Sequence, residues 1–507
     1  MNIAMLLDLI ADAFGDRTAF TDGEVSLTYA ELRDLARTAG DALTSEGART
    51  LAFADVSSAA VPVALFGAAW AGASYAPLNF RLPVESLRTQ IKRLEGPYAV
   101  ASDGLTAELR SAPLVSTPDW WESLRSAADG STESGSYAMD PECAAVILFT
   151  SGSSGSPKAA LLSHDNLLSY VMDTVEFAGA DDGEALVLAA PPFHIAGVAA
   201  VLSSVYSGRR LLPLASFSPE AWLQLARTGG ATHAFVVPTM LARIVQRMES
   251  DPSLRVPTLR AISYGGARMA APILERALEL FPDVEFVNAY GLTETSSTIA
   301  VLGPTDHREA LASTDGETRR RLESVGQPLP GVEVAIVDES GAAVPVGVRG
   351  LIRVRGPQVG GEYLDTESSL DDAGWLVTGD IGFIDAAGYL FVEGRADDVI
   401  IKGGENLSPA EIEDALLRHE AVESAVVVGV PHPEWGESVA AAVVLGAPAK
   451  GSTDQDVTEA LTGWVRESLG SLKTPSRIVI CDELPTTATG KVLRRVVRDQ
   501  LAPDPEG

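Results

Sequence analysis

The stretch from Thr150 to Lys158 reads T-S-G-S-S-G-S-P-K and combines hydroxyl groups, glycines and one ammonium group. Glycines let a backbone approach an anion closely, while backbone N–H groups, Ser and Thr hydroxyls and a lysine supply donors to a phosphate. The apolar run 144–149 before it predicts a buried strand, and residues 163–170 after it predict a helix. The spacing is not that of a Walker A loop. We therefore expect a phosphate-binding loop between strand and helix, with a surface loop as the alternative.

A second group of reactive side chains follows the apolar run 284–287. Residues 288–295 read N-A-Y-G-L-T-E-T. The Tyr290 ring suits stacking on a base and the Thr293 hydroxyl suits a phosphate. The Glu294 carboxylate suits Mg²⁺, a hard ion that takes few protein ligands. A strand-end turn without a ligand is the alternative.

Three further polar segments lie in the last third of the chain. T-G-D at 378–380 offers the Asp380 carboxylate, which suits both hydroxyls of a ribose. G-R-A-D-D at 394–398 is followed by K-G-G-E-N at 402–406, and T-T-A-T-G-K at 486–491 ends on Lys491. Taken singly, each segment is typical of an ordinary turn or of a solvated surface charge. Their order along the chain gives them weight.

Charge and cysteine content exclude some classes of protein. The 507 residues include 38 basic and 69 acidic side chains, a formal net charge of −31. Such a chain repels phosphate backbones and anionic lipid, which argues against nucleic acid as a partner and requires local donors for any anionic ligand. Cys143 and Cys481 lie far apart in or beside apolar stretches. We expect buried thiols and a cytoplasmic location.

Two uncharged stretches, 56–80 and 185–208, are long enough to raise the question of a membrane span. The first contains several Ser, Gly and Pro residues, and the second contains two consecutive prolines and His194. Buried helices and strands of a large core explain both better than a membrane span. The N-terminus lacks the basic region of a signal peptide.

The remaining pattern predicts an α/β fold with mostly parallel sheets covered by helices. Short apolar runs at 185–190, 234–237, 260–263 and 284–287 alternate with helical stretches. Thr28 and Glu31 have capping-box spacing for a helix start, and so do Ser408 and Glu411, with Pro409 between them. Runs 332–337 and 350–354 indicate a small β-subdomain, and residues after about 399 indicate a small, mobile α+β lid domain.

The ordered set of motifs resembles the adenylate-forming superfamily, which comprises acyl-CoA synthetases, peptide-synthetase adenylation domains and firefly-type luciferases. The motifs are T-S-G-S-S-G-S-P-K, P-P-F-H, Y-G-L-T-E, T-G-D, G-R-A-D-D and T-G-K, and the likeness runs from about Leu27 to Arg495. The resemblance implies an N-terminal domain at 1–394, a hinge at 395–398 and a C-terminal lid at 399–507. The active site lies between the two domains in that family.

Roles for the nucleotide site follow from the resemblance. Thr150, Ser151, Gly152, Ser153, Ser154, Gly155 and Lys158 are expected to wrap the β- and γ-phosphates of ATP. The adenine slot is expected at Gly265, Gly266, Ala267, Asn288, Ala289, Tyr290 and Gly291. Thr293 is expected to contact the α-phosphate, Glu294 and Thr150 to hold Mg²⁺, and Asp380 with Arg395 to bind the ribose. Lys491 is the expected lid lysine of the first half-reaction.

The resemblance also implies a second half-reaction with coenzyme A. The lid is expected to turn about Asp397, which withdraws Lys491 and presents Gly403, Gly404 and Glu405 to the pantetheine arm. His194 is expected at the acyl pocket as a gate or orienting residue. The predicted pocket is small and apolar and consists of His194, Ile195, Ala196, Gly197, Val198, Val236, Gly265 and Gly291.

Among the branches of that family, the sequence favours an acyl-CoA synthetase that uses a carboxylic acid, ATP, Mg²⁺ and CoA. The segment 193–197 lacks the aspartate that would hold an amino acid's ammonium group, and no carrier-protein motif follows Lys491. Three alternatives stay open: luciferase-like oxygenation, loading of a separate acyl carrier protein, and a catalytically silent relative. A homodimer also stays open, and the acid and its chain length are not determined.

Overall fold

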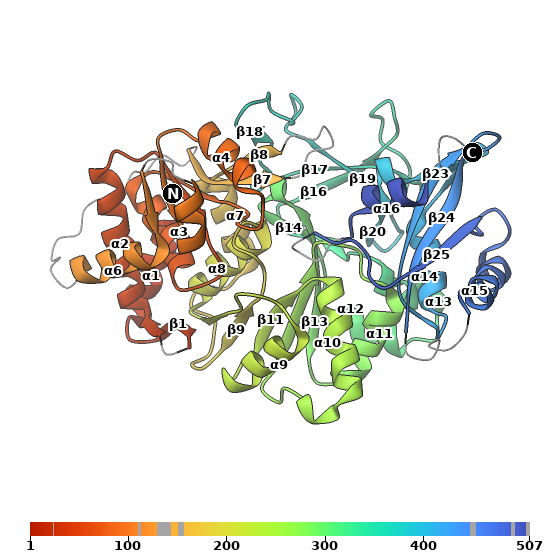
Figure 1. Cartoon of the computed structure of the whole chain (residues 1–507), viewed down its shortest axis with the longest axis horizontal. Helices are drawn as coiled ribbons and strands as arrows, with labels where there is room; N and C mark the ends of the chain where they lie inside the picture. The colour runs from red at the N-terminus through yellow and green to blue at the C-terminus, as the bar shows by residue number, and fades with distance from the viewer. Residues whose placement is uncertain are drawn as a thin grey trace.

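A computed structural model describes residues 1–23, 25–109, 113–128, 143–150, 157–446, 453–487 and 492–502. In Figure 1 the chain runs from N-terminal α/β layers at one end, through a central sheet and its helices, to a smaller C-terminal domain at the other end. The predicted fold class is confirmed: two large mostly parallel sheets, a small β-subdomain and a small α+β domain.

The first large sheet contains seven of the described strands in the order β18-β8-β7-β4-β3-β5-β6. Its centre is parallel, and β8 joins β7 antiparallel. Its strands are β3 (Thr50–Ala54), β4 (Ser74–Pro77), β5 (Pro97–Ala101), β6 (Leu114–Ser116), β7 (Ala144–Thr150), β8 (Lys158–Ser163) and β18 (Glu362–Tyr363).

The second large sheet contains nine of the described strands in the order β15-β14-β13-β12-β11-β9-β10-β1-β2. The strands from β13 to β1 are parallel, so their carboxyl ends meet at one edge, where ligands of such sheets bind. Its strands are β1 (Thr18–Asp22), β2 (Val25–Thr28), β9 (Ala185–Leu188), β10 (Arg210–Pro213), β11 (His233–Val236), β12 (Ala261–Gly265), β13 (Glu285–Leu292), β14 (Ser297–Leu302) and β15 (Gln327–Pro328).

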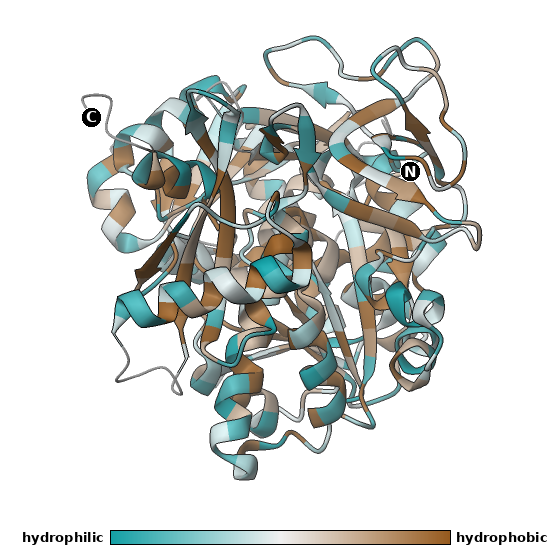
Figure 2. Ribbon diagram, turned by 90° about the vertical axis from the view of Figure 1, so that its right-hand side faces the viewer, coloured by the Kyte–Doolittle hydropathy of each residue, from teal (hydrophilic) through white to brown (hydrophobic). Residues whose placement is uncertain are grey.

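Helices cover both faces of these sheets. The apolar core between the sheets buries α3 (Ala60–Ala71), which is hydrophobic on all sides as a central helix must be. Figure 2 shows hydrophobic colour gathered on the inner strands and helices and hydrophilic colour on the outer helices. The other helices are α1 (Ala4–Phe14), α2 (Tyr29–Ser45), α4 (Val84–Arg93), α5 (Asp103–Leu109), α6 (Thr117–Ala128), α7 (His164–Thr174), α8 (Ile195–Ser207), α9 (Pro219–Thr228), α10 (Pro238–Ser250), α11 (Ala271–Leu280), α12 (Pro304–Ala312) and α13 (Gly316–Arg320).

The β-subdomain and the C-terminal domain follow in sequence. The subdomain is the antiparallel sheet β16-β17-β19-β20, with strands Glu333–Val337, Gly350–Arg355, Leu376–Ile384 and Leu390–Arg395. A 3₁₀ turn, η4 (Ala396–Asp398), then leads to the last sheet. That sheet has strands β21 (Ile400–Lys402), β22 (Glu405–Leu407), β23 (Val422–His432), β24 (Gly436–Leu445) and β25 (Arg477–Cys481), packed with α14 (Pro409–Leu417), α15 (Asp454–Leu469) and α16 (Arg494–Leu501).

The surroundings of the predicted phosphate loop differ from the expectation. Strand β8 begins at Lys158 and pairs antiparallel with β7, Thr150 lying opposite Lys158. The loop therefore joins two strands of a hairpin, and α7 begins only after β8. The predicted strand at 144–149 and helix from 163 are confirmed as β7 and α7, but the direct connection of loop to helix is wrong, because residues 158–163 form a partly buried strand before the Ser163 cap. Residues 151–156 themselves lie outside the described part of the chain.

Two predicted helix starts have different outcomes. Thr28 caps α2, and a full capping box with Glu31 is present. Helix α14 also begins at Pro409, but the Ser408 side chain does not cap it and instead donates to the Glu393 carbonyl at 3.3 Å. In the described ranges, no helix is both long enough and apolar enough to cross a membrane.

Candidate functional site

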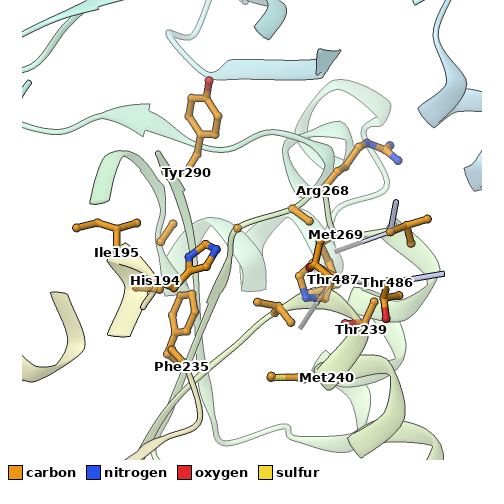
Figure 3. A pocket seen from close by; sticks show the side chains of 18 of the residues that line it. His194, Ile195, Phe235, Thr239, Met240, Arg268, Met269, Tyr290, Thr486 and Thr487 are labelled. Carbon is orange, nitrogen blue, oxygen red and sulfur yellow. The ribbon is translucent and has the colours of Figure 1, made fainter. Parts of the chain in front are cut away.

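A cavity of about 2830 Å³ lies between the two large sheets, the β-subdomain and the C-terminal domain. Motif residues far apart in the sequence meet on its wall, and Figure 3 shows part of it. The predicted nucleotide-site residues that line it are Thr150, Lys158, Gly266, Ala267, Asn288, Ala289, Tyr290, Gly291, Thr293, Glu294, Asp380 and Arg395.

Tyr290, Asp380 and Arg395 form one hydrogen-bonded group on the wall. The Tyr290 hydroxyl donates to Asp380 Oδ2 at 2.6 Å, and Arg395 Nη1 donates to Asp380 Oδ1 at 3.3 Å and to the Thr378 carbonyl at 2.9 Å. Burial, with the Asp380 carboxylate beside it, raises the pKa of Tyr290 well above its ordinary value, so the phenol stays protonated and donates. The Asp380 side chain is 9 % exposed, and the hydrogen bonds from Tyr290 and Arg395 hold it in place.

Glu294 lies on the cavity wall and is linked through Tyr363 to Lys158, a residue of the predicted phosphate loop. The Tyr363 hydroxyl donates to Glu294 Oε1 at 2.7 Å, and Lys158 Nζ lies 5.2 Å from the centre of the Tyr363 ring. The pKa of Tyr363 is raised, mainly by burial and to a smaller extent by the hydrogen bond to Glu294. The described residues contain no group of three or more His, Cys, Asp or Glu that could hold a metal. A single carboxylate suits Mg²⁺ that takes its other ligands from phosphates and water.

The turn between β13 and β14 holds Glu294 in position. Gly291 is required here because a Cβ on it would lie 1.6 Å from the Ser297 carbonyl oxygen. Ser296 and Ser297 adopt positive φ angles of 53° and 112°, a strained conformation of the kind found at functional sites. Gln358 supports the turn by donating to the carbonyls of Thr295 at 2.9 Å and Thr298 at 2.6 Å.

Gly265 is an exception in the predicted adenine slot, because it does not line the cavity. It ends β12 with its Cα hydrogen against the neighbouring strand, where a Cβ would lie 2.2 Å from the Ala289 carbonyl oxygen. Gly266 and Ala267, which follow, do line the cavity. The side chain of Asn288 donates to the Ser324 carbonyl at 3.2 Å.

The acyl-pocket prediction is partly wrong. His194, Ile195, Ala196 and Gly291 line the cavity, whereas Gly197, Val198, Val236 and Gly265 do not. The error follows from periodicity. Alternate side chains of a strand face opposite sides, so Phe235 and Val237 face the cavity while Val236 is buried against the outer helices. In Figure 3, His194 lies over Phe235.

The C-terminal domain completes the wall through α14, the start of β23 and the segments 482–487 and 492–496. Arg268 binds Asp414 of α14 with both terminal nitrogens, one of them at 2.8 Å from Oδ1. The predicted hinge residue Asp397 lines the cavity, and its carbonyl accepts from Arg498 at 3.5 Å. Thr486 and Thr487 line the same cavity as Met269, and Figure 3 labels all three. Lys491 lies outside the described residues, as do Ser151, Gly152, Ser153, Ser154 and Gly155.

The predicted CoA residues Gly403, Gly404 and Glu405 do not line this cavity. The two glycines form the two-residue turn of the β21–β22 hairpin, with φ angles of 60° and 86°. Trp435 packs on Gly403, so that a Cβ there would lie 2.8 Å from the indole ring. In this orientation of the domain the glycines are therefore explained by the turn, and a role in CoA binding needs another orientation.

Sequence reasoning missed Tyr363, Gln358 and Arg268. Each is a single residue in an unremarkable stretch, and each acts through a partner more than 60 positions away. No local signal in the sequence points to them.

Comparison with known proteins agrees with this geometry. The family model of the AMP-binding enzymes matches residues 7–364, and that of the AMP-binding enzyme C-terminal domain matches residues 411–491. The chain therefore belongs to the AMP-binding enzyme family, the adenylate-forming class that the sequence indicated.

Particular relatives are similar over most of the chain. A feruloyl-CoA synthase of Amycolatopsis sp is 34% identical, covering 95% of this chain and 95% of the relative. The fatty acid–[acyl-carrier-protein] ligase ScoC of Streptomyces coeruleorubidus is 32% identical, covering 86% of this chain and 84% of the relative. The o-succinylbenzoate CoA synthetase of Bacillus subtilis, solved with its acyl-adenylate, has a TM-score of 0.81 at 27% identity, covering 97% of this chain and 98% of that one. The same synthetase has been solved with ATP and magnesium ion.

Proposed function

We propose that this protein is an ATP-dependent carboxylic acid:CoA ligase that works through an acyl-adenylate. One observation carries the proposal. The Tyr290–Asp380–Arg395 group and the Glu294 carboxylate line the same cavity as His194 and the apolar side chains near it. A nucleotide and an acid can therefore meet there. Relatives that ligate aryl acids to CoA support the same assignment.

The first half-reaction joins the acid to AMP. A carboxylate oxygen attacks the α-phosphorus, the bond to the β-phosphate oxygen breaks, and pyrophosphate leaves. Asp380 and Arg395 hold the ribose, Thr293 donates to the α-phosphate, and Lys158 donates to the leaving phosphates. Bound through Glu294 and Thr150, Mg²⁺ would neutralise phosphate charge.

Lys491 is proposed as the second source of positive charge at the α-phosphate. Removal of one well-placed donor to a developing negative charge typically costs about 10²–10³ in rate. Lys491→Ala should lose adenylation by about that factor. Wild-type pyrophosphate exchange in this variant would refute the role.

The second half-reaction transfers the acyl group to the CoA thiol. The sulfur attacks the acyl carbonyl carbon, the mixed anhydride bond breaks, and AMP leaves with the oxygen that came from the acid. We place the hinge of the required movement at 395–398, between domains 1–394 and 399–507, with Asp397 at its centre. Gly403, Gly404 and Glu405 would then approach the pantetheine arm.

The state of the cysteines supports a cytoplasmic location. Cys143 and Cys481 are partly buried, where full burial was expected, and neither forms a disulfide, as is usual in a reducing compartment. The similarity to ScoC favours a second candidate function, loading of an acyl carrier protein in place of CoA.

The test is acid-dependent release of pyrophosphate from ATP and Mg²⁺ across a panel of carboxylic acids, with and without CoA. Release that rises sharply with CoA for one acid supports the ligase. Adenylation that is indifferent to CoA favours the carrier-protein function. No turnover with any acid contradicts both and leaves a catalytically silent relative.

A further inference from the structure

The cavity extends below His194 along one face of α8. Beyond Ile195 at the start of the helix, that face carries small side chains that line the cavity, at Ala196, Ala199, Ala200 and Ser203. Their spacing places them along one side of the helix. The bulky residues of α8 point the other way, into the core between the sheets: Val198, Val201, Leu202 and Val205. The helix is thus anchored by one face and leaves a space beneath the other.

The nine-stranded sheet forms the opposite wall of this space. Leu186, His233, Phe235, Ser263 and Val287 line it and lie in register on neighbouring strands. Alternate residues of the same strands are buried against the outer helices and do not line the cavity: Val187, Val236, Ile262 and Phe286. The lining side chains lie in the middle of the sheet and are only partly buried, so they face the open space of the cavity. Helix α8 and the sheet therefore enclose a slot.

The slot is elongated along both of its walls. From Ala196 to Ser203 the helix advances about 10 Å, at roughly 1.5 Å per residue. From Val237 to His233 the β11 side extends about 13 Å, at roughly 3.3 Å per residue. The upper end meets His194, close to where the acid's carboxylate must lie to reach the nucleotide. The lower end is lined by His233 and Arg209.

The lower end is polar but electrically compensated. Arg209 donates to Glu184 Oε2 at 3.2 and 3.0 Å. Arg260 lies 3.2 Å from Glu184 Oε1 and 3.5 Å from Asp181 Oδ2, so two carboxylates face two guanidinium groups. The His233 Nδ1 atom shares a hydrogen bond with Thr232 at 2.8 Å. Burial, with Arg209 beside it, lowers the pKa of His233 to about 4, so the ring is neutral at pH 7. The described residues at the lower end of the slot therefore offer a ligand neutral hydrogen-bonding groups, and the charged side chains there are paired with one another.

We propose that the acid taken by this slot is elongated, with a neutral hydrogen-bonding group at the end remote from its carboxylate. An arylpropenoate with a para hydroxyl is such an acid. A second carboxylate would have to enter a partly buried region in which Glu184 already compensates Arg209, and it would lose hydration without gaining a free cation. This inference rests on the proposed function and names its substrate class.

The first experiment tests how deep the slot is, by placing a larger side chain on the face of α8 that lines it. Ala200→Leu should lower kcat/KM for 3-(4-hydroxyphenyl)propenoate relative to propanoate by about 100-fold, because the added side chain occupies the path. Ser203→Leu, about 4.5 Å further along the helix, should accept longer straight-chain acids than Ala200→Leu does. Ala127→Leu makes the same change at an exposed position of α6 and serves as the control. The proposal would be overturned if the ratio of kcat/KM for 3-(4-hydroxyphenyl)propenoate to kcat/KM for propanoate were unchanged in both Ala200→Leu and Ser203→Leu.

The polar end is tested with three acids of one shape: 3-phenylpropenoate with a para hydrogen, hydroxyl or carboxylate. The wild-type enzyme should prefer the hydroxyl over the hydrogen by roughly ten-fold, from one hydrogen bond, and reject the carboxylate more strongly. His233→Phe should abolish the preference for the hydroxyl. Equal use of all three, or preference for the carboxylate, overturns the inference but leaves the ligase assignment intact. Absence of turnover with every acid, propanoate included, overturns the proposed function and this inference with it.

Discussion

The ion pair between Arg268 and Asp414 joins the N-terminal domain to the C-terminal domain beside the active-site cavity. The guanidinium binds the carboxylate with two nitrogens, and its Nη1 atom also lies 3.4 Å from the Ala410 carbonyl. The Asp414 side chain is 12 % exposed and that of Arg268 is 30 % exposed. If the second half-reaction needs another orientation of the C-terminal domain, this pair stabilises the first orientation only.

The size of the effect follows from that partial burial. Exposed pairs contribute up to about 1 kcal/mol, and loss of one partner of a fully buried pair costs about 3–5 kcal/mol. A pair of intermediate burial should contribute about 1–3 kcal/mol. Since about 1.4 kcal/mol corresponds to a factor of ten, Asp414→Asn should shift the balance between the two orientations by roughly 5- to 150-fold.

The assay measures the two half-reactions separately. Acid-dependent exchange of pyrophosphate into ATP reports adenylation, and CoA thioester formation from a supplied acyl-adenylate reports the second step. Asp414→Asn and Arg268→Ala should slow exchange and leave thioester formation undiminished or faster. The double variant should be no worse than either single variant, because both remove the same contact.

A bidentate pair within one subdomain supplies the control. Arg355 binds Glu333 across β16 and β17, at 2.8 Å from both carboxylate oxygens, and neither residue lines the cavity. Glu333→Gln should change neither half-reaction. Equal losses in both half-reactions for Asp414→Asn, or no loss in either, would refute the reasoning.

Three further outcomes are expected. Asp380→Asn should raise the KM for ATP by about 10- to 100-fold, the effect of weakening hydrogen bonds to a charged group, without changing the KM for CoA; an unchanged KM for ATP contradicts the ribose role. Glu294→Gln should raise the Mg²⁺ concentration that half-saturates pyrophosphate exchange by about ten-fold, while Tyr363 keeps an acceptor; an unaltered Mg²⁺ dependence counts against it. Burial lowers the pKa of His307 to about 4, so the unfolded chain binds an extra proton between about pH 6.5 and 4. Stability should therefore fall by up to about 3 kcal/mol as the pH drops through that window, and urea unfolding of His307→Phe should show a shallower decline.

The motif residues were the part of the site best predicted from sequence. Tyr290, Asp380 and Arg395 come from short polar segments that follow or end strands, and the fold brings them within hydrogen-bonding distance. The structure brings the three residues together on one cavity wall, and their roles toward a nucleotide stay predictions. The parallel sheets and the separate C-terminal domain were predictable for a related reason, the alternation of apolar runs with helical stretches.

What failed depended on long-range geometry. The sequence indicates no strand between Lys158 and the helix that starts at Ser163, because that strand exists only through its pairing with β7. Val236 was chosen for the acyl pocket in place of Phe235, a one-residue error that places a side chain on the opposite face of the sheet. Tyr363 could not be found at all, because its role exists only through contact with Glu294.

The most direct test of the central claim follows one oxygen atom. The enzyme is supplied with ATP, Mg²⁺, CoA and 3-(4-hydroxyphenyl)propenoate labelled with ¹⁸O in its carboxylate, and the AMP product is analysed by mass spectrometry. Attack of the carboxylate on the α-phosphorus, followed by attack of the thiol on the acyl carbon, leaves one ¹⁸O in each AMP. Label in inorganic phosphate together with ADP, or AMP without label, would contradict an acyl-adenylate.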